Sequence, residues 1–259
     1  MKQINTIIFS MNRAAQLDLL LQSIKRFAPW MWPPTILHRC TSATVATMFR
    51  FYRAAHFSGE EIASKETLRP DHHIEVTWQL PLKEKLLAAI DPAVRLTTLL
   101  VDDSVFYRRC GFLPNQLGER EAFALHLGRN CTYCYPFARA QKEGESDFLT
   151  AWTVDGNVYR TDDLLGCLQA IEFNTPNNLE DAMGRAARPM KVVYAEHGCM
   201  VTIPANVVQH EYANRSGGGS PEELNTRYLA GERLDLDTMD FSNVTAWHQE
   251  IPFAWKAKA

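Results

Sequence analysis

The sequence predicts an α/β protein with a mostly parallel central sheet flanked by helices, and two observations carry this prediction. Short apolar runs alternate with segments whose apolar residues recur at helical spacing, a pattern typical of parallel strands joined by crossover helices. In addition, the run LTTLLV at Leu96–Val101 contains no charged residue, which suits a central parallel strand buried on both faces.

The first half of the chain predicts its elements in a regular order. The β-branched and aromatic run over 4–10 indicates a buried strand. Apolar residues at helical spacing indicate a helix over 14–27, which the PWMWPP segment ends because proline lacks an N–H and restricts the residue before it. The elements expected next are a strand over 35–40, a helix over 43–55, a strand over 74–78, a helix over 81–90 and the strand 96–101.

The second half is less regular, and we expect shorter elements there. These are extended structure over 122–127, strands over 148–152 and 158–159 around the turn Asp155-Gly156-Asn157, helices over 164–171 and 177–188, and strands over 192–194 and 200–203. The glycine-rich segment 213–222 has little to bury and predicts a flexible loop. We expect one domain over 1–259.

Charge and hydropathy argue against two classes of protein. The 259 residues are 46% hydrophobic, enough for a large core, and a formal net charge of −3 does not suit a protein that grips nucleic-acid phosphates. The apolar run Thr6–Phe9 is too short for a signal peptide or a membrane span, and no later run approaches the length of a span. We therefore expect a cytoplasmic protein with no transmembrane segment, for which peripheral membrane contact stays open.

Two adjacent carboxylates, Asp102 and Asp103, end the predicted strand 96–101. Ligands of open α/β sheets bind outside the carboxyl ends of the strands, and a carboxylate pair there suits a hard divalent cation that bridges to nucleotide phosphates. The alternative is that both residues only open a turn or cap the following segment.

A second polar cluster, formed by Ser10, Asn12 and Arg13, follows the first strand at the same predicted edge. An arginine at this place can bind a nucleotide or its phosphates as a bidentate donor. Its alternative role is that of a solvated residue at the start of a helix.

Several segments resemble, in order, the GT-A glycosyltransferases of the family-2-like and exostosin-like types. IIFSMNRAAQLDLLLQSI resembles their first strand, nucleotide-binding turn and first helix, and TILHRC with the following Thr-Ser pair resembles the second strand. LLVDDSVF resembles their D-x-D metal-binding motif, and FALHLGRN and FNTPNNLE resemble blocks that follow it in bacterial members. The resemblance implies a GT-A fold in which half 1–105 binds a nucleotide sugar and half 106–259 binds an acceptor.

The resemblance also implies a reaction and its partners. A sugar would pass from a nucleotide-diphosphate sugar, such as a UDP-sugar, to a hydroxyl of a glycan, a lipid-linked acceptor or a small molecule. A divalent metal, Mn²⁺ or Mg²⁺, would assist departure of the diphosphate. The donor-binding residues would be Ser10, Asn12, Arg13, Asp102 and Asp103, and the loop 213–222 would close over the donor.

The metal motif is incomplete, because Ser104 stands where the D-x-D pattern has its second acid. Asp103 would then hold the metal while Asp102 contacts the ribose or sugar, and a further ligand is needed. His197, in a late segment, is our candidate, since imidazole suits Mn²⁺ better than Mg²⁺. His210 competes for this role, and an ordinary hydrogen-bonded histidine is the alternative to both.

Three acids are candidates for catalysis: Asp155, Glu180 and Asp181. An inverting transferase needs a carboxylate that removes the proton of the acceptor hydroxyl. Glu180-Asp181 resembles the Glu-Asp pair from which inverting family-2-like enzymes draw this base. The alternative is electrostatic, since acids in the first turn of a helix stabilise it by ~0.3–1 kcal/mol each.

Two other functions stay open on the residues alone. A nucleotidyltransferase uses a similar sheet and acidic metal site, although such enzymes usually carry a glycine-rich phosphate loop and SMNRAAQ contains no glycine. A non-catalytic nucleotide- or glycan-binding module would keep the Asp102–Asp103 pocket without turnover.

Overall fold

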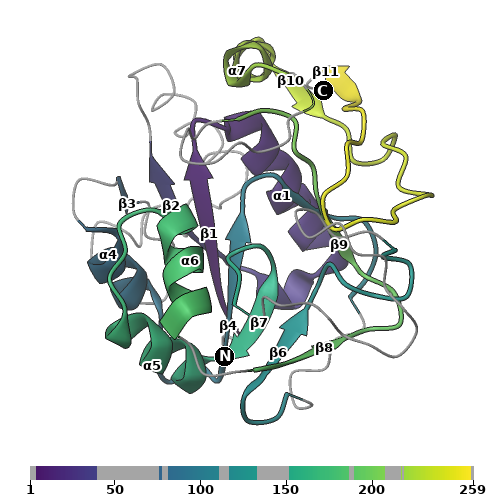
Figure 1. Cartoon of the computed structure of the whole chain (residues 1–259). Helices are drawn as coiled ribbons and strands as arrows, with labels where there is room; N and C mark the ends of the chain where they lie inside the picture. Colours follow the sequence, from purple (N-terminus) through teal and green to yellow (C-terminus); the bar gives the residue numbers. More distant parts are fainter. Residues whose placement is uncertain are drawn as a thin grey trace.

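The structure is a computed structural model that describes residues 4–39, 76–77, 81–110, 117–132, 152–186, 190–207, 217 and 219–257. The centre of the described part is a seven-stranded sheet in the order β3-β2-β1-β4-β7-β6-β8 (Figure 1). Its strands are β1 (Asn5–Met11), β2 (Thr35–Arg39), β3 (Val76–Thr77), β4 (Leu96–Val101), β6 (Glu121–Ala124), β7 (Asn157–Arg160) and β8 (Lys191–Tyr194).

The sheet is mixed and mostly parallel. β1 pairs in parallel with β2 on one side and with β4 on the other, and β3 continues the parallel set beyond β2. β7 is antiparallel to both β4 and β6, and β8 is parallel to β6. The predicted fold class, α/β with a mostly parallel sheet flanked by helices, is therefore confirmed.

Helices cover both faces of the sheet (Figure 1). α1 (Ala14–Phe27) packs on one face, where Ile8 and Leu100 belong to the same buried cluster as its leucines. The opposite face holds Ile7 and Leu99, which share a second cluster with α4 (Leu82–Ala89), α5 (Thr161–Ala170) and α6 (Pro176–Ala186). Alternate residues of each central strand point to opposite faces, so β1 and β4 each contribute to both clusters.

Smaller elements surround this three-layer body. β5 (Ser104–Phe106) pairs antiparallel with β9 (Met200–Thr202), and a short 3₁₀ helix, η1 (Pro29–Met31), follows α1. β10 (Glu232–Leu234) pairs antiparallel with β11 (Trp255–Ala257) beside α7 (Pro221–Leu229). None of the helices in the described part combines the length and apolarity of a membrane span.

The structure differs from several sequence expectations. The predicted helix 43–55 and residues 148–151 lie outside the described residues, and Trp152–Gly156 forms no strand, so the described part contains no hairpin around Asp155. In the predicted loop 213–222, residues 213–216 and 218 also lie outside the described residues, but Ser220 caps α7 and Pro221 begins it.

Helix α6 begins earlier than expected, and this changes the alternative role of its acids. Its first residue is Pro176, so Glu180 and Asp181 lie in the second turn and the first turn contains no acid. Proline favours the first helical position because its missing N–H would have no partner there in any case. A first-turn dipole effect therefore does not explain these two acids.

Candidate functional site

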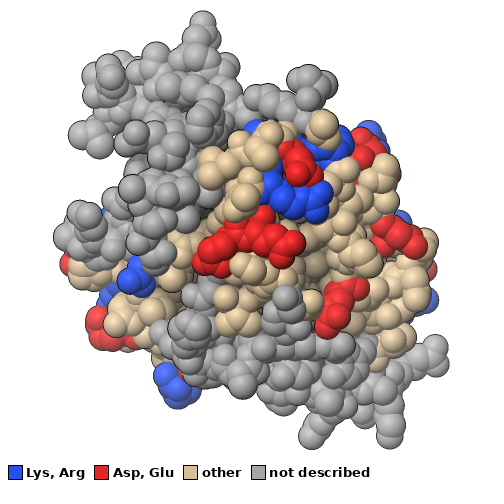
Figure 2. All heavy atoms as spheres, turned by 90° about the horizontal axis from the view of Figure 1, so that it is seen from above, with Lys and Arg blue, Asp and Glu red and all other residues tan. Residues whose placement is uncertain are grey.

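The carboxyl ends of β1 and β4 meet where the strand order of the sheet reverses. From β1 the chain proceeds to β2 and β3 on one side and then returns to β4 on the other. Ligands of open α/β sheets bind at such a switch point. Figure 2 looks onto this edge and shows acidic side chains near its centre beside basic ones. The backbone N–H of Asp102 donates to the carbonyl of Phe9 over 3.1 Å, which holds the two strand ends together.

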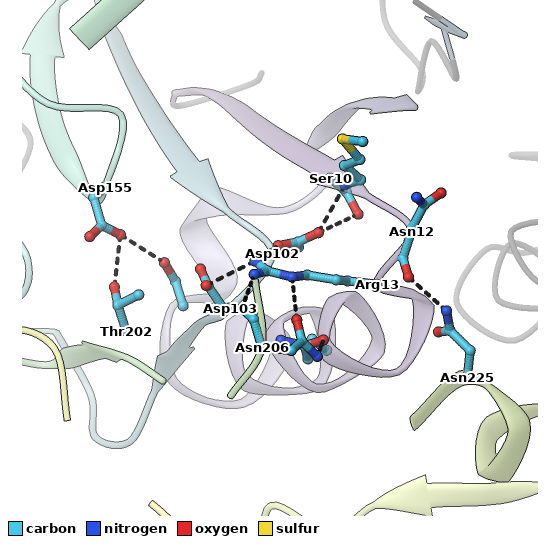
Figure 3. Close-up of polar contacts among 12 residues, drawn as sticks. Ser10, Asn12, Arg13, Asp102, Asp103, Asp155, Thr202, Asn206 and Asn225 are labelled. Atoms are coloured by element: carbon cyan, nitrogen blue, oxygen red, sulfur yellow. Dashed lines mark hydrogen bonds and ion pairs between the residues drawn. The ribbon is translucent and has the colours of Figure 1, made fainter. Parts of the chain in front are cut away.

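Asp102 is the hub of what we call the switch-point cluster, formed by Ser10, Arg13, Asp102, Asp103 and Asn206 (Figure 3). Its Oδ2 accepts from the Ser10 hydroxyl at 2.8 Å and from the Met11 N–H at 3.1 Å. Its Oδ1 accepts from Arg13 at 3.0 Å. Asp102 is buried and both its oxygens are engaged, so it shapes the turn after β1.

Arg13 joins three parts of the chain from a buried position at the start of α1. One terminal nitrogen donates to Asp102 at 3.0 Å and to Asp103 at 2.9 Å. The guanidinium also donates to the side-chain oxygen of Asn206 at 2.7 Å and to its carbonyl. These contacts use four of its five N–H groups, so Arg13 mainly orients the two carboxylates.

Asp103 differs from Asp102 in that one of its oxygens is uncommitted. Its Oδ2 accepts from Arg13, whereas its Oδ1 accepts no hydrogen bond from any described residue. Burial raises the pKa of Asp103 to about 6 against the opposing charge of Arg13, and the charges of Asp102 and Asp155 add to the rise. A cation placed at this oxygen would therefore be stabilised.

Asp155 forms a second cluster, the Asp155 cluster, with Ser104, Thr202, Trp247 and His248. Its Oδ1 accepts from Thr202 at 2.7 Å and from Ser104 at 3.3 Å (Figure 3). Its Oδ2 accepts from the Trp247 indole N–H at 2.9 Å and lies 2.9 Å from the Nε2 of His248. Burial would raise the pKa of Asp155, but His248 outweighs it and the pKa is lowered. Asp155 is thus an ionised anchor with four donors.

His248 reaches this cluster from the irregular C-terminal part of the chain. The backbone holds it there, since Thr202 N–H donates to the Trp247 carbonyl and Gln249 N–H donates to the Thr202 carbonyl, both over 3.0 Å. Burial lowers the pKa of His248, but the hydrogen bond and charge of Asp155 outweigh it and raise the pKa overall. Asp103 and Glu180 raise it further, so His248 lies within electrostatic reach of three acids.

The two acids of α6 lie in different surroundings. Glu180 accepts from the hydroxyl of Thr153 and from the N–H of Val154, and its other carboxylate oxygen has no partner among the described residues. Burial raises the pKa of Glu180 to about 7, and the charge of Asp155 adds to this. Asp181 is exposed on the same helix.

His197 lies apart from the acids in the described structure. It is exposed in the turn between β8 and β9, which contacts the segment 128–130 through the backbone of Glu196 and Gly198. The histidine brought next to the acids is His248. His210 lies outside the described residues.

Sequence reasoning finds the acids on both sides of the site and misses several of their partners. The structure brings together Ser10, Arg13, Asp102 and Asp103, and Asn12 lies in the same turn (Figure 3). The missed residues are Thr202, Asn225 and His248. Only tertiary contacts join these residues to the site, and no local pattern in the sequence indicates them.

Comparison with known proteins found no sequence match and a solved structure of low similarity. No protein-family model and no curated protein sequence matches the chain. Among solved structures, it is similar to the mannosyltransferase PcManGT of Pyrobaculum calidifontis, whose structure contains GDP-Man and Mn²⁺, with a TM-score of 0.43 and 10% identity. The match covers 75% of this chain and 56% of that one, so the chain spans little more than half of the matched protein.

Proposed function

We propose that this protein transfers a sugar from a nucleotide-diphosphate sugar to a hydroxyl acceptor. The observation that carries the proposal is the position of Asp102 and Asp103 at the carboxyl end of β4, beside the turn after β1 and at the switch point of the sheet. A nucleotide bound there would meet the turn of Ser10, Asn12 and Arg13 on one side and Asp103 on the other.

The two aspartates would divide the work on the donor side. Asp102, with both oxygens engaged, would hold the shape of the Asn12–Arg13 turn. Asp103 keeps one oxygen available for a ligand, and its pKa is raised to about 6 by burial and by the charges of Asp102 and Asp155, which a bound cation would oppose. This division supports the sequence expectation that Asp103 is the metal-holding acid, while it gives Asp102 a structural part.

We propose that Asp103 and His248 would hold a divalent cation; the described residues contain no group of three or more His, Cys, Asp or Glu side chains that could hold a metal ion. The Nδ1 of His248 is buried with no hydrogen-bond partner in the described structure, while the Nε2 is held by Asp155 at 2.9 Å. Metal-binding histidines commonly have their second nitrogen held by a carboxylate in this way. Bound there, a divalent cation would neutralise the diphosphate that leaves with the nucleotide. The proposed histidine is thus His248 and not His197.

Glu180 is the proposed base for the acceptor hydroxyl. A pKa of about 7 matches proton removal at neutral pH, and one oxygen of the carboxylate is uncommitted within the described part. Asp155 has four donors and a lowered pKa, which suit an anchor better than a base. Asp181 is exposed and stays the second candidate from the sequence.

Thermal unfolding with UDP, GDP, CDP and TDP, each with and without Mn²⁺, tests the donor site. We expect one diphosphate to raise the unfolding temperature in a metal-dependent way, because a ligand that binds only the folded state stabilises it. Asp103→Asn should lose the metal-dependent part, whereas Glu172→Gln, at a side chain that is 89% exposed, should keep it. Absence of stabilisation by every nucleotide would refute the proposal.

Product analysis separates the proposed enzyme from the two alternatives. A glycosyltransferase releases a nucleoside diphosphate from the sugar nucleotide that stabilises the protein. The release is slow when the sugar is transferred to water and faster when an acceptor is present. A nucleotidyltransferase would instead release pyrophosphate from a nucleoside triphosphate. A binding module would be stabilised by the nucleotide and release neither product.

A further inference from the structure

Helix α7 lies beside the beginning of α1 and contacts it through two buried polar side chains. The Asn225 side-chain N–H donates to the carbonyl of Asn12 at 2.6 Å (Figure 3). The Tyr228 hydroxyl donates to the Oδ1 of Asp18 at 3.3 Å. Asn225 and Tyr228 are three positions apart and therefore share one face of α7. Of these two side chains, Asn225 is the one that contacts the turn following β1.

Asn12 has a backbone conformation that needs support. Its φ is 57°, in the left-handed region, which is costly for residues other than glycine and is tolerated best by asparagine and aspartate. The N–H of Asn12 donates to the Arg39 carbonyl at 3.2 Å, and the carbonyl of Asn12 accepts from Asn225. The backbone N–H of Asn12 is thus held by β2, and its backbone carbonyl is held by α7.

The peptide that leaves Asn12 sets the start of α1 and the direction of Arg13. No side chain caps α1 at this end, and its first backbone hydrogen bond runs from the Leu17 N–H to the carbonyl of Arg13 itself. Arg13 must nevertheless point its guanidinium at Asp102 and Asp103. A rotation of the Asn12–Arg13 peptide would move this group away from both carboxylates.

We infer that Asn225 is a positioning residue of the nucleotide site, which acts from α7 by holding the left-handed Asn12 and thereby aligning Arg13 with Asp102 and Asp103. This inference rests on the proposed function, because the alignment of Arg13 with the two aspartates has a role only if a nucleotide binds beside them. It also makes α7, which follows the predicted loop in the sequence, a part of the donor site. In Figure 3 the Asn12 side chain points away from Asn225, so Asn225 contacts the backbone of Asn12 and not its side chain.

The test compares Asn225→Asp with Tyr228→Phe. Aspartate has the shape of asparagine but cannot donate to the Asn12 carbonyl when ionised. Tyr228→Phe removes the other hydrogen bond between α7 and α1 and leaves the Asn12 turn untouched. Two quantities are measured in each variant: the Cα and Cβ chemical shifts of Asn12, and the dissociation constants of UDP and GDP with Mn²⁺ by calorimetry.

We expect Asn225→Asp to move the Asn12 chemical shifts away from values typical of the left-handed conformation. We also expect it to raise the dissociation constant of the nucleoside diphosphate by roughly tenfold. Tyr228→Phe should leave both quantities near those of the wild type. Unchanged Asn12 shifts in Asn225→Asp, or equal weakening in both variants, would overturn the inference. If Asn225→Asp does not fold, Asn225→Ala is measured in the same way. If the wild type binds neither nucleotide, the proposed function fails, and the Asn12 shifts alone decide whether Asn225 holds the turn.

Discussion

The Nε2 of His248 lies 2.9 Å from the Oδ2 of Asp155, and this ion pair joins the C-terminal segment to the edge of the central sheet. The same oxygen accepts from the indole of Trp247 at 2.9 Å, and the Trp247 ring stacks on buried His126 with 3.6 Å between ring centroids. The Asp155 cluster therefore sets where the chain after β9 runs and places an imidazole within electrostatic reach of Asp103.

Replacement of Asp155 by asparagine tests this anchoring role. The new side-chain amide would direct an NH₂ group at donors and leave buried groups unpaired, so we expect Asp155→Asn to lose about 3–5 kcal/mol of unfolding free energy in urea. Asp162 provides a matched control, because its ion pair with Arg160 is exposed. Asp162→Asn should lose about 1 kcal/mol or less. Equal losses would mean that Asp155 is not an anchor.

The sequence is sufficient to predict the part of the site that is local to strand ends. The apolar runs of β1 and β4 each stop at a polar group, and parallel pairing of Ile8 with Leu100 makes both groups end at one edge. Ser10 and Asp102 are therefore predictable as neighbours from the strand pattern alone. Helical periodicity likewise places α1 over Ala14–Phe27 with the observed bounds.

The rest of the site depends on contacts that have no periodic signal. His248 and Asn225 reach the sheet edge because distant segments pack there, and neither the spacing nor the type of their neighbours indicates it. The start of α6 is within reach of sequence reasoning, because Pro176 favours the first helical position. If the helix is taken to start at Asn177, Glu180 falls in the first turn and the helix dipole alone accounts for an acid there. The sequence then gives no reason to expect that Glu180 is buried.

Arg13 should be intolerant of lysine although the charge is kept. A lysine has one nitrogen and cannot reach Asp102, Asp103 and Asn206 with the fork of donors that arginine provides. We expect Arg13→Lys to lose about 2 kcal/mol or more of unfolding free energy. Arg26→Lys is the control, since Arg26 pairs with Asp237 at the surface, and should change stability by about 0.5 kcal/mol or less. A small effect at both positions would contradict the role given to Arg13.

Gly156 should reject a methyl group mainly because of its backbone conformation. Its φ is +92°, which residues with a side chain rarely adopt, and a Cβ placed 2.0 Å from the terminal carbon of Met200 would also displace the end of that flexible side chain. We expect Gly156→Ala to lose about 2 kcal/mol or more of stability. Gly166 lies inside α5, where a Cβ would have no neighbour within 4 Å, so Gly166→Ala should gain about 0.5–1 kcal/mol. A neutral Gly156→Ala would show that alanine adopts the backbone conformation of this turn without strain.

Glu180 should make the protein less stable as the pH rises from 4.5 to 7. Burial raises the pKa of its carboxyl from 4.5 to about 7, so in this window the folded protein holds a proton that the unfolded chain has released. Folding then takes up a proton, and the free energy of unfolding falls with increasing pH. The raised pKa of Asp103 acts in the same direction at lower pH, so the comparison must be between variants.

Urea midpoints at pH 5, 6, 7 and 8 isolate the contribution of Glu180. Glu180→Gln cannot titrate, and its midpoint should fall less steeply than that of the wild type between pH 5 and 7, so that the variant is relatively more stable at pH 8. Glu172→Gln, at an exposed carboxyl, should follow the wild-type curve. The same burial that destabilises the ionised carboxylate would make it a stronger acceptor for the proton of an acceptor hydroxyl. A Glu180→Gln curve parallel to that of the wild type would show that Glu180 titrates as an ordinary carboxyl, and the proposed base would lose its support.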